Sequence, residues 1–171
     1  MNLTRKIAVQ SVLFVAVAVA AAGCGTTKPK PVAWTLSIKK ATQSSIKVDV
    51  VGVNQSQKLY WENAKVADYW KENSPMRQGA NKVDVKFAGN PPLWTLDRKD
   101  KATWDNWLNH GCTYLMIIAD LPGGPFGEGP FDRRRLMVPL DKNVWNPKNK
   151  TLEFEIQDGM INALTPQNPG S

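Results

Sequence analysis

Apolar and polar residues alternate along much of the chain, and this period of two predicts β-strands. Every second residue is apolar over positions 32–38, and the same pattern returns over 46–50, where Lys47 and Asp49 fall on the polar side. Alternation of this kind turns one face of a strand toward a core and the other toward water. Both segments therefore predict strands, with Lys47 and Asp49 pointing outward.

Residues 57–71 have a different period, of three to four, which predicts a helix. The residues that would share its buried face are Leu59, Asn63, Val66 and Trp70. Ser56 is the predicted N-cap, and Asn73-Ser74-Pro75 is the predicted end. A second, shorter helix is predicted over residues 99–109, where His110-Gly111 marks its end.

Strand patterns also occupy residues 83–87, 93–96, 113–121, 136–138 and 152–156. Segment 113–121 is apolar almost throughout, which is typical of a strand buried on both faces. Asp158-Gly159 predicts a tight turn that lets residues 160–164 pair back as a hairpin. The predicted fold class is mainly β: an antiparallel β-sandwich, transthyretin- or immunoglobulin-like, with one or two short inserted helices. A parallel α/β fold would need regular alternation of strands and helices, which is missing.

The N-terminus has the layout of a bacterial lipoprotein signal. Arg5 and Lys6 precede an uncharged apolar run over residues 7–22, and Gly23 leads into Cys24. A basic start, an apolar middle and a small-residue cleavage site define a secretory signal. We therefore expect cleavage after residue 23 and acylation of Cys24. The alternative is ordinary cleavage near residues 20–22, with Cys24 unmodified.

Acylation of Cys24 would divide the chain into four parts: a signal peptide over 1–23, a lipidated tether over 24–31, a β-sandwich domain over 32–165 and a flexible tail over 166–171. The tether is polar and contains proline, and its seven residues after Cys24 span roughly 20 Å or slightly more when extended. Gly25, where an Asp would signal inner-membrane retention, favours the outer membrane. We expect a protein anchored in the lipid bilayer on the periplasmic face of the outer membrane.

The chain is mildly basic. Its formal net charge is +7, and loss of Arg5 and Lys6 with the signal removes two of these charges. The densest basic run, residues 133–135, indicates either a solvated face or a patch for an acidic partner or lipid headgroups. Nucleic acid is not an expected partner, because no basic helix or recognised binding motif is present.

No catalytic constellation is evident. His110 is the only histidine, which excludes zinc sites built from several histidines, and its neighbour Cys112 lacks an orienting partner for nucleophilic chemistry. No carboxylates follow the pattern of a calcium loop. We therefore expect no metal, no cofactor and no enzymatic activity. Cys112 is expected to be a buried thiol; a disulfide with an unacylated Cys24 is the alternative.

Two segments are candidates for partner binding. The loop over residues 122–130 holds four glycines and three prolines, and it is either a flexible connection or a binding loop. Its candidate contacts are Gly124, Phe126 and Glu128. The second segment, over 93–110, is rich in tryptophan, which indicates either a satellite core or an exposed aromatic surface for protein or glycan. Its candidate residues are Trp94, Trp104 and Trp107.

The order of these elements resembles the outer-membrane lipoproteins of type VI secretion systems, the TssJ/SciN-like family. The likeness rests on the strand over 45–53, the helical segment over 58–70 with an Ala-Asp pair between aromatic residues, the buried strand over 114–120 and the terminal hairpin over 152–164. It covers roughly two thirds of the mature chain. The family's Asn-Pro-Asp-like loop between its first strands is missing, since residues 40–44 are short.

This resemblance implies a lipid-anchored, non-enzymatic scaffold, acylated at Cys24, that tethers an envelope-spanning secretion complex to the outer membrane. Its partner would be the periplasmic domain of an inner-membrane secretion protein. The missing loop helps this docking in the family, so the sequence leaves the docking surface open. The alternative function is an envelope lipoprotein that binds another ligand, such as a glycan or peptidoglycan, through a Trp-rich surface.

Overall fold

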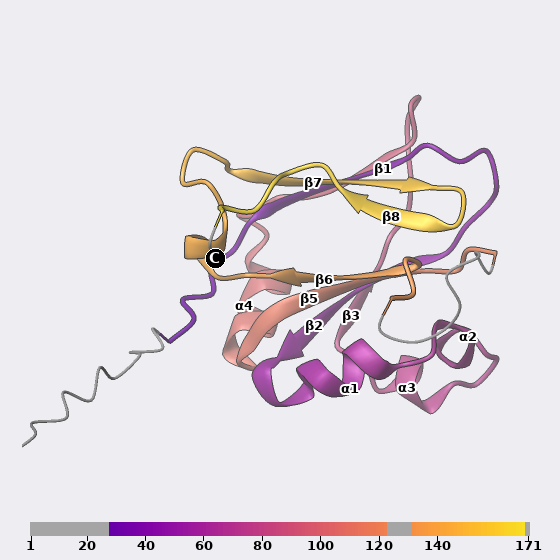
Figure 1. Cartoon of the computed structure of the whole chain (residues 1–171), viewed down its shortest axis with the longest axis horizontal. Coiled ribbons are helices and arrows are strands. Elements are labelled where there is room, and N and C mark those ends of the chain that lie inside the picture. The colour runs from indigo at the N-terminus through magenta and orange to yellow at the C-terminus, as the bar shows by residue number, and fades with distance from the viewer. Residues whose placement is uncertain (1–27, 123–130, 170–171) are drawn as a thin grey trace, which may run out of the picture.

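The computed structural model describes residues 28–122 and 131–169, and its strands form two packed sheets (Figure 1). One sheet has the order β4-β1-β7-β8 and the other the order β3-β2-β5-β6. The strands are β1 (Thr35–Lys40), β2 (Val48–Asn54), β3 (Lys82–Asp84), β4 (Leu93–Leu96), β5 (Cys112–Ala119), β6 (Arg135–Pro139), β7 (Thr151–Gln157) and β8 (Met160–Ala163). The predicted mainly β sandwich is confirmed. Among the described strands one pair, β1 with β7, is parallel, and the other pairs are antiparallel.

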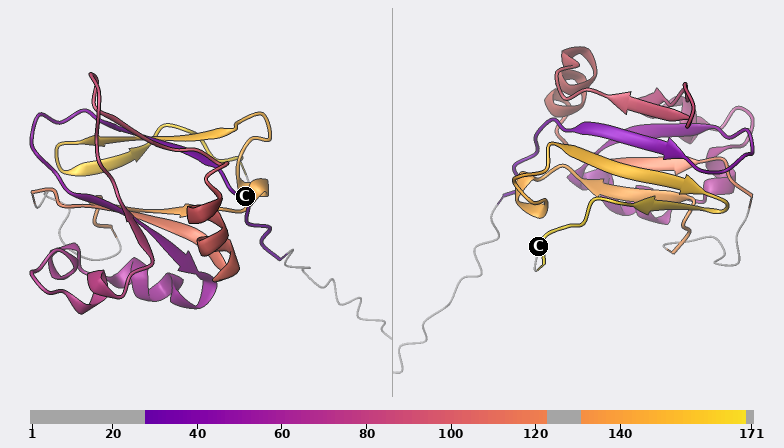
Figure 2. Two further views of the ribbon diagram at one scale, coloured as in Figure 1. Left: turned by 180° about the vertical axis from the view of Figure 1, so that it is seen from behind. Right: turned by 90° about the horizontal axis from the view of Figure 1, so that it is seen from above.

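Short helices join and cover these sheets (Figure 2). They are α1 (Lys58–Asn63), α2 (Val66–Tyr69), α3 (Pro75–Gln78) and α4 (Lys101–Asn109), with the 3₁₀ turns η1 (Gln55–Gln57) and η2 (Lys142–Val144). The first three follow β2 and lie against the outer face of its sheet (Figure 1). The fourth connects β4 of one sheet to β5 of the other, and thus closes one end of the sandwich.

The molecule has two apolar cores because one sheet is covered on both faces. The main core lies between the sheets and takes Leu36 and Ile38 from β1 and Leu115 and Ile117 from β5. The second core lies between that sheet's outer face and the helices; its buried members are Val51, Val53, Trp61, Val66, Tyr69, Met116 and Ile118. Burial on both faces explains why 113–121 is apolar almost throughout.

The predicted helix over 57–71 is not continuous. Ala64 has ψ 137° and Lys65 has ψ 122°, so an extended step separates α1 from α2. This step resets the helical phase, and the predicted buried face is wrong in α1, where Leu59 is 70% exposed and Trp61 is buried. In α2 it is confirmed for Val66, which is buried. The predicted cap at Ser56 is also wrong, because the cap is Asn54, whose side chain accepts a hydrogen bond from the Gln57 amide at 3.0 Å.

The C-terminal half follows the predictions more closely. The hairpin of β7 and β8 turns at Gly159, which has φ 79°, a conformation that favours glycine. The α4 helix ends at the predicted place, before Gly111 with φ 71°. Within the predicted tail, the Asn168 amide donates to the Val144 carbonyl at 2.8 Å, so the described part of this segment lies against the fold.

Candidate functional site

The N-terminal segment, described from residue 28, enters the sandwich at one end, beside η2. Pro31 forms a β-bridge with Asp141, and the Val32 amide donates to the Leu140 carbonyl at 3.1 Å. Two buried indoles, Trp34 and Trp145, pack edge to face beneath this point, with ring centroids 6.5 Å apart. These contacts give the N-terminal segment a defined exit from the fold (Figure 1). Cys24 itself lies outside the described residues.

The candidate loop residues Gly124, Phe126 and Glu128 also lie outside the described residues. Phe131, which follows this loop, is 85% exposed. The structure therefore describes only the flank of the loop.

The tryptophan segment belongs to the core. Trp104 and Trp107 are 1% and 0% exposed, so the hypothesis that they form an exposed binding surface is wrong. Their rings pack edge to face at 5.3 Å, and the Trp107 Nε1 donates to the Asn81 carbonyl at 3.0 Å. Trp94 is half-buried and packs against the same core. These indoles are buried because α4 closes an open end of the sandwich, which a periodicity argument does not show.

The basic run over 133–135 is not a solvated face. Arg134 and Arg135 are buried, at 9% and 7% exposure. The Arg134 guanidinium makes a bidentate contact with the Asp132 carboxylate. Although burial raises the pKa of Asp132, its hydrogen bonds to Arg134 outweigh that effect and hold the pKa below its ordinary value.

Arg135 ties strand β6 to helix α1. Its guanidinium donates to the carbonyls of Trp61, Glu62 and Ala64 at the C-terminal end of α1, where helical carbonyls run out of amide partners. The Trp61 carbonyl also accepts the Ala64 amide. Burial lowers the pKa of this arginine. The contact is structural: it holds a two-turn helix in place across the sheet.

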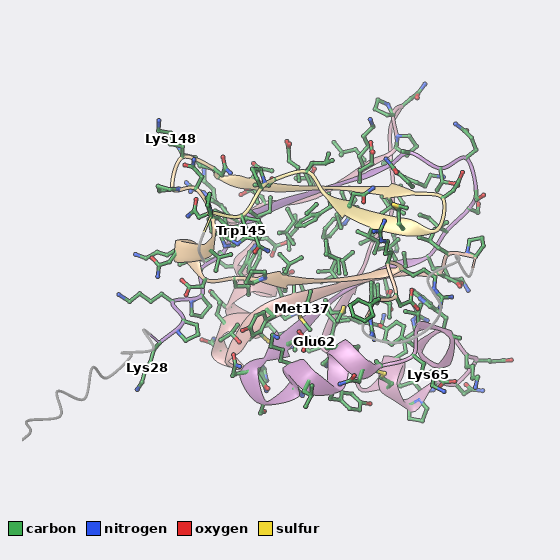
Figure 3. All side chains as sticks on the ribbon, in the orientation of Figure 1. Lys28, Glu62, Lys65, Met137, Trp145 and Lys148 are labelled. Carbon is green, nitrogen blue, oxygen red and sulfur yellow. The ribbon has the colours of Figure 1, made fainter. Side chains whose placement is uncertain are left out.

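A groove opens between α1 and β6, and we call it the α1–β6 groove. Its volume is about 370 Å³, and its lining residues are Leu59, Glu62, Asn63, Met116, Arg135 and Met137. Figure 3 shows Glu62 and Met137 close together on this side of the molecule. One of these lining residues, Leu59, is an apolar side chain with 70% exposure. Leu59, Met116 and Met137 give the groove an apolar lining, and apolar grooves of this kind are typical of binding sites.

The groove owes its floor to pairing across the sheet. Met116 of β5 is opposite Met137 of β6 in the antiparallel register, and both methionines lie on the outer face that the helices only partly cover. Because methionine is unbranched and polarisable, it adapts to differently shaped apolar partners. Strand β6 is also the last strand of its sheet, so the groove lies at a sheet edge.

A buried carboxylate fastens the helical layer to the sheet. Asp49 is 1% exposed, so the prediction that it points to water is wrong. Its Oδ2 accepts hydrogen bonds from the Tyr69 hydroxyl at 2.7 Å and from Arg77 Nε at 2.8 Å, and Lys82 Nζ lies 3.7 Å away. Burial, and then the hydrogen bond to Asp49, raise the pKa of Tyr69 far above its ordinary value. The cluster joins α2 and α3 to β2 and β3, and we interpret it as structural.

We expect the Arg77→Met variant to lose about 2 kcal/mol of unfolding free energy. Removing one partner of a fully buried ion pair costs roughly 3–5 kcal/mol. We expect a smaller loss of about 2 kcal/mol because Arg77 is about one-third exposed and because Asp49 keeps its contacts with Tyr69 and Lys82. Urea denaturation measures this loss. In the Asp49→Asn background the same substitution is expected to cost clearly less, because no charge is left unpaired. An equal cost in both backgrounds would contradict the importance of the buried charge.

The His110–Cys112 segment has no catalytic arrangement. His110 is exposed, and its Nδ1 lies 2.6 Å from the Asn106 carbonyl at the end of α4. Cys112 is a free, buried thiol, as expected, and burial raises its pKa to about 11. A nucleophilic cysteine needs the opposite shift. Within residues 28–122 and 131–169, no three metal-ligating side chains come together.

A scan of protein-family models, a search of curated proteins and a search of solved structures each found no match for this chain. In the part of the chain that the structure describes, no helix is long and apolar enough to cross a membrane. Among the described residues, the surfaces that we take forward are the end where the N-terminal segment leaves the fold and the α1–β6 groove; the candidate loop residues Gly124, Phe126 and Glu128 stay a prediction.

Proposed function

We propose that this chain is a lipid-anchored, non-enzymatic scaffold that tethers an envelope-spanning, type VI-like secretion complex to the periplasmic face of the outer membrane. The observation that carries the proposal is the position of the tether exit. The chain leaves the fold at Pro31, seven residues after the cysteine of a lipoprotein-like signal. Acyl chains on Cys24 would hold this end of the sandwich within roughly 25 Å of the bilayer.

The arrangement of the fold supports the family resemblance. Helices α1 to α3 are inserted between β2 and β3 of a sandwich, in the order on which that resemblance rests. The connection between β1 and β2 is short and held close to the domain: Thr42 is buried, and its hydroxyl donates to the Asp158 carboxylate. We therefore infer that docking of the secretion partner uses a surface other than this loop.

The α1–β6 groove is the surface that we assign to the partner. Its exposed Leu59 supplies apolar contact area, and Met116 and Met137 supply an adaptable floor. The proposed occupant is an apolar segment of the periplasmic domain of an inner-membrane secretion protein. Methionine is enriched in such interfaces, and a few well-packed residues at the centre of the contact carry most of the affinity.

Crosslinked pull-down from native cell envelopes tests the scaffold function, and the same measurement on a groove variant tests the docking surface. The tagged full-length protein is expected to recover a large inner-membrane protein together with other secretion-apparatus components, identified by mass spectrometry. Recovery of only peptidoglycan fragments or unrelated outer-membrane proteins would contradict the scaffold function.

The Leu59→Asp variant is expected to recover at least tenfold less of that inner-membrane protein, because it places a charge in an apolar contact. The matched control is Leu164→Asp, which makes the same change at another exposed leucine, 52% exposed and outside the groove. Both leucines are exposed, so neither change should unfold the domain. Equal recovery by the two variants would mean that the partner binds elsewhere on the scaffold.

A further inference from the structure

The end of the sandwich where the tether exits carries a group of exposed lysines, which we call the lysine rim. Its members are Lys28, Lys30, Lys142, Lys148 and Lys150. Figure 3 shows Lys28 and Lys148 at this end, with the buried Trp145 between them. The rim thus brings together the start of the described chain and the segment before β7, which are more than a hundred residues apart in the sequence.

Backbone hydrogen bonds hold the rim together. The Lys142 amide donates to the Lys30 carbonyl at 3.3 Å, and the Thr35 amide donates to the Lys150 carbonyl at 3.2 Å. The Lys148 amide donates to the side chain of Asn146 at 3.0 Å. The backbone positions of Lys30, Lys142, Lys148 and Lys150 are therefore set by the fold.

The rim keeps a net positive charge. No ion pair involves any of its five lysines within residues 28–122 and 131–169. Two carboxylates lie in the same segments: Asp141, which accepts a hydrogen bond from the Asn143 amide, and Glu153, which lines a hollow together with Lys148 and Lys150. The adjoining corner between β4 and α4 is balanced, with Arg98, Lys99 and Lys101 against Asp97, Asp100 and Asp105.

We propose that the lysine rim binds the phosphate groups of anionic phospholipids in the leaflet that holds the acyl chains, and that this contact orients the sandwich with its tether end against the bilayer. The proposal rests on acylation of Cys24. Lys28 is four residues from that cysteine, at most about 14 Å along the chain, so the anchor itself brings the rim to the headgroups.

Charge and shape both suit this surface. A lysine within about a Debye length of an anionic membrane, roughly 8 Å, strengthens binding about fivefold. A hollow of about 460 Å³ lies beside Trp34 and Trp145, with Lys142 in its wall, and it has room for a phosphate-bearing headgroup. The indole N–H groups of Trp34 and Trp145 already donate to backbone carbonyls and are therefore not free to bind a phosphate. Lys142 is the positively charged side chain in the wall of the hollow.

Headgroup quenching on vesicles tests the proposal with the full protein purified from membranes. A fluorophore on Asn149→Cys lies between Lys148 and Lys150, and a fluorophore on Gln157→Cys lies at the other end of β7, roughly 20 Å away. Phosphatidylcholine vesicles carry a headgroup quencher, with or without phosphatidylglycerol. We expect the residue-149 label to be quenched several-fold more on anionic vesicles, and high salt to abolish the difference.

Matched double variants identify the lysines responsible. The double variant Lys142→Gln, Lys148→Gln is expected to lower at least tenfold the fraction of protein whose residue-149 label lies against the headgroups. The double variant Lys47→Gln, Lys86→Gln makes the same charge change at exposed sites away from the rim and should leave this fraction unchanged. Equal quenching of the residue-149 label on both kinds of vesicle would overturn the proposal. So would a response of this label to isolated peptidoglycan and not to lipid. Protein that fails to stay on neutral vesicles would instead contradict acylation of Cys24, and this proposal with it.

Discussion

Replacing Cys24 by serine is expected to remove the protein from the outer-membrane fraction. Without the thiol no lipid can be attached, and each buried methylene of an acyl chain contributes roughly 0.8 kcal/mol to membrane binding. Two or three chains therefore hold the domain far more firmly than the five lysines of the rim, so the loss should be nearly complete. Separation of inner and outer membranes on a density gradient, followed by immunoblotting, measures the distribution. The intact mass of the wild-type protein should show the acyl chains on residue 24.

Cys112→Ser is the matched control, because it makes the same substitution at a cysteine that is buried in the sandwich. This variant is expected to stay with the outer membrane. A Cys24→Ser protein that still sediments with the outer membrane in high salt would show that lipid is not the anchor. A wild-type mass without acyl chains would show the same independently.

Gly52→Ala is expected to cost about 3 kcal/mol of unfolding free energy, at the upper end of the range for an overpacked core. A Cβ at this position in β2 would lie 2.4 Å from Trp107 Cδ1 and 2.8 Å from Cys112 Sγ. The ring has nowhere to move: Trp107 is fully buried, and its Nε1 donates to the Asn81 carbonyl, which also accepts the Gly52 amide. Strand β2 must therefore move away from α4, or the Trp107 ring must move and lose its hydrogen bond to the Asn81 carbonyl.

Thermal and urea unfolding of the variant measure this cost, which corresponds to a fall in Tm of about 6–12 °C for a domain of this size. Gly79→Ala is the control, since its added Cβ would lie 3.4 Å from the Pro75 carbonyl oxygen and its φ of −83° suits any residue. Its stability should stay within about 0.5 kcal/mol of the wild type. A Gly52→Ala protein as stable as the wild type would mean that the α4 end of the core is loosely packed.

The strands could be predicted from the sequence because their signal is local. Alternation of apolar residues located β1, β2 and β7, the Asp158-Gly159 pair located the hairpin turn, and the continuous apolar run located β5. The helical layer was harder to predict. Its period of three to four runs through Ala64 and Lys65, where the backbone is extended, and a hydrophobic pattern does not register such a break. The wrong prediction that Leu59 is buried together with Val66 followed from that one step.

The candidate site shows the same division. The sequence indicated the lipoprotein-like signal and its cysteine, which lies outside the described residues. It did not indicate the α1–β6 groove, whose residues come from a helix and two strands far apart in the chain. It placed Asp49 on a solvated face, because nothing local shows that helices will cover that face and bring Arg77 to it. The sequence did contain one signal of a buried ion pair, namely a single acidic residue in an otherwise apolar strand. A carboxylate in such a position is buried only when a partner neutralises it.

By itself, the sequence determined the strand pattern, the sandwich class and the expectation of an anchored N-terminus, because each depends on neighbouring residues. Only the tertiary structure decided which aromatic and charged side chains are buried. Trp104, Trp107 and Arg135 look like surface candidates in the sequence, yet each fills a space made by distant elements. The lysine rim is the converse case, in which separate, unremarkable lysines become one charged surface. Burial and proximity depend on the packing of elements across the whole chain, and a local pattern does not contain that information.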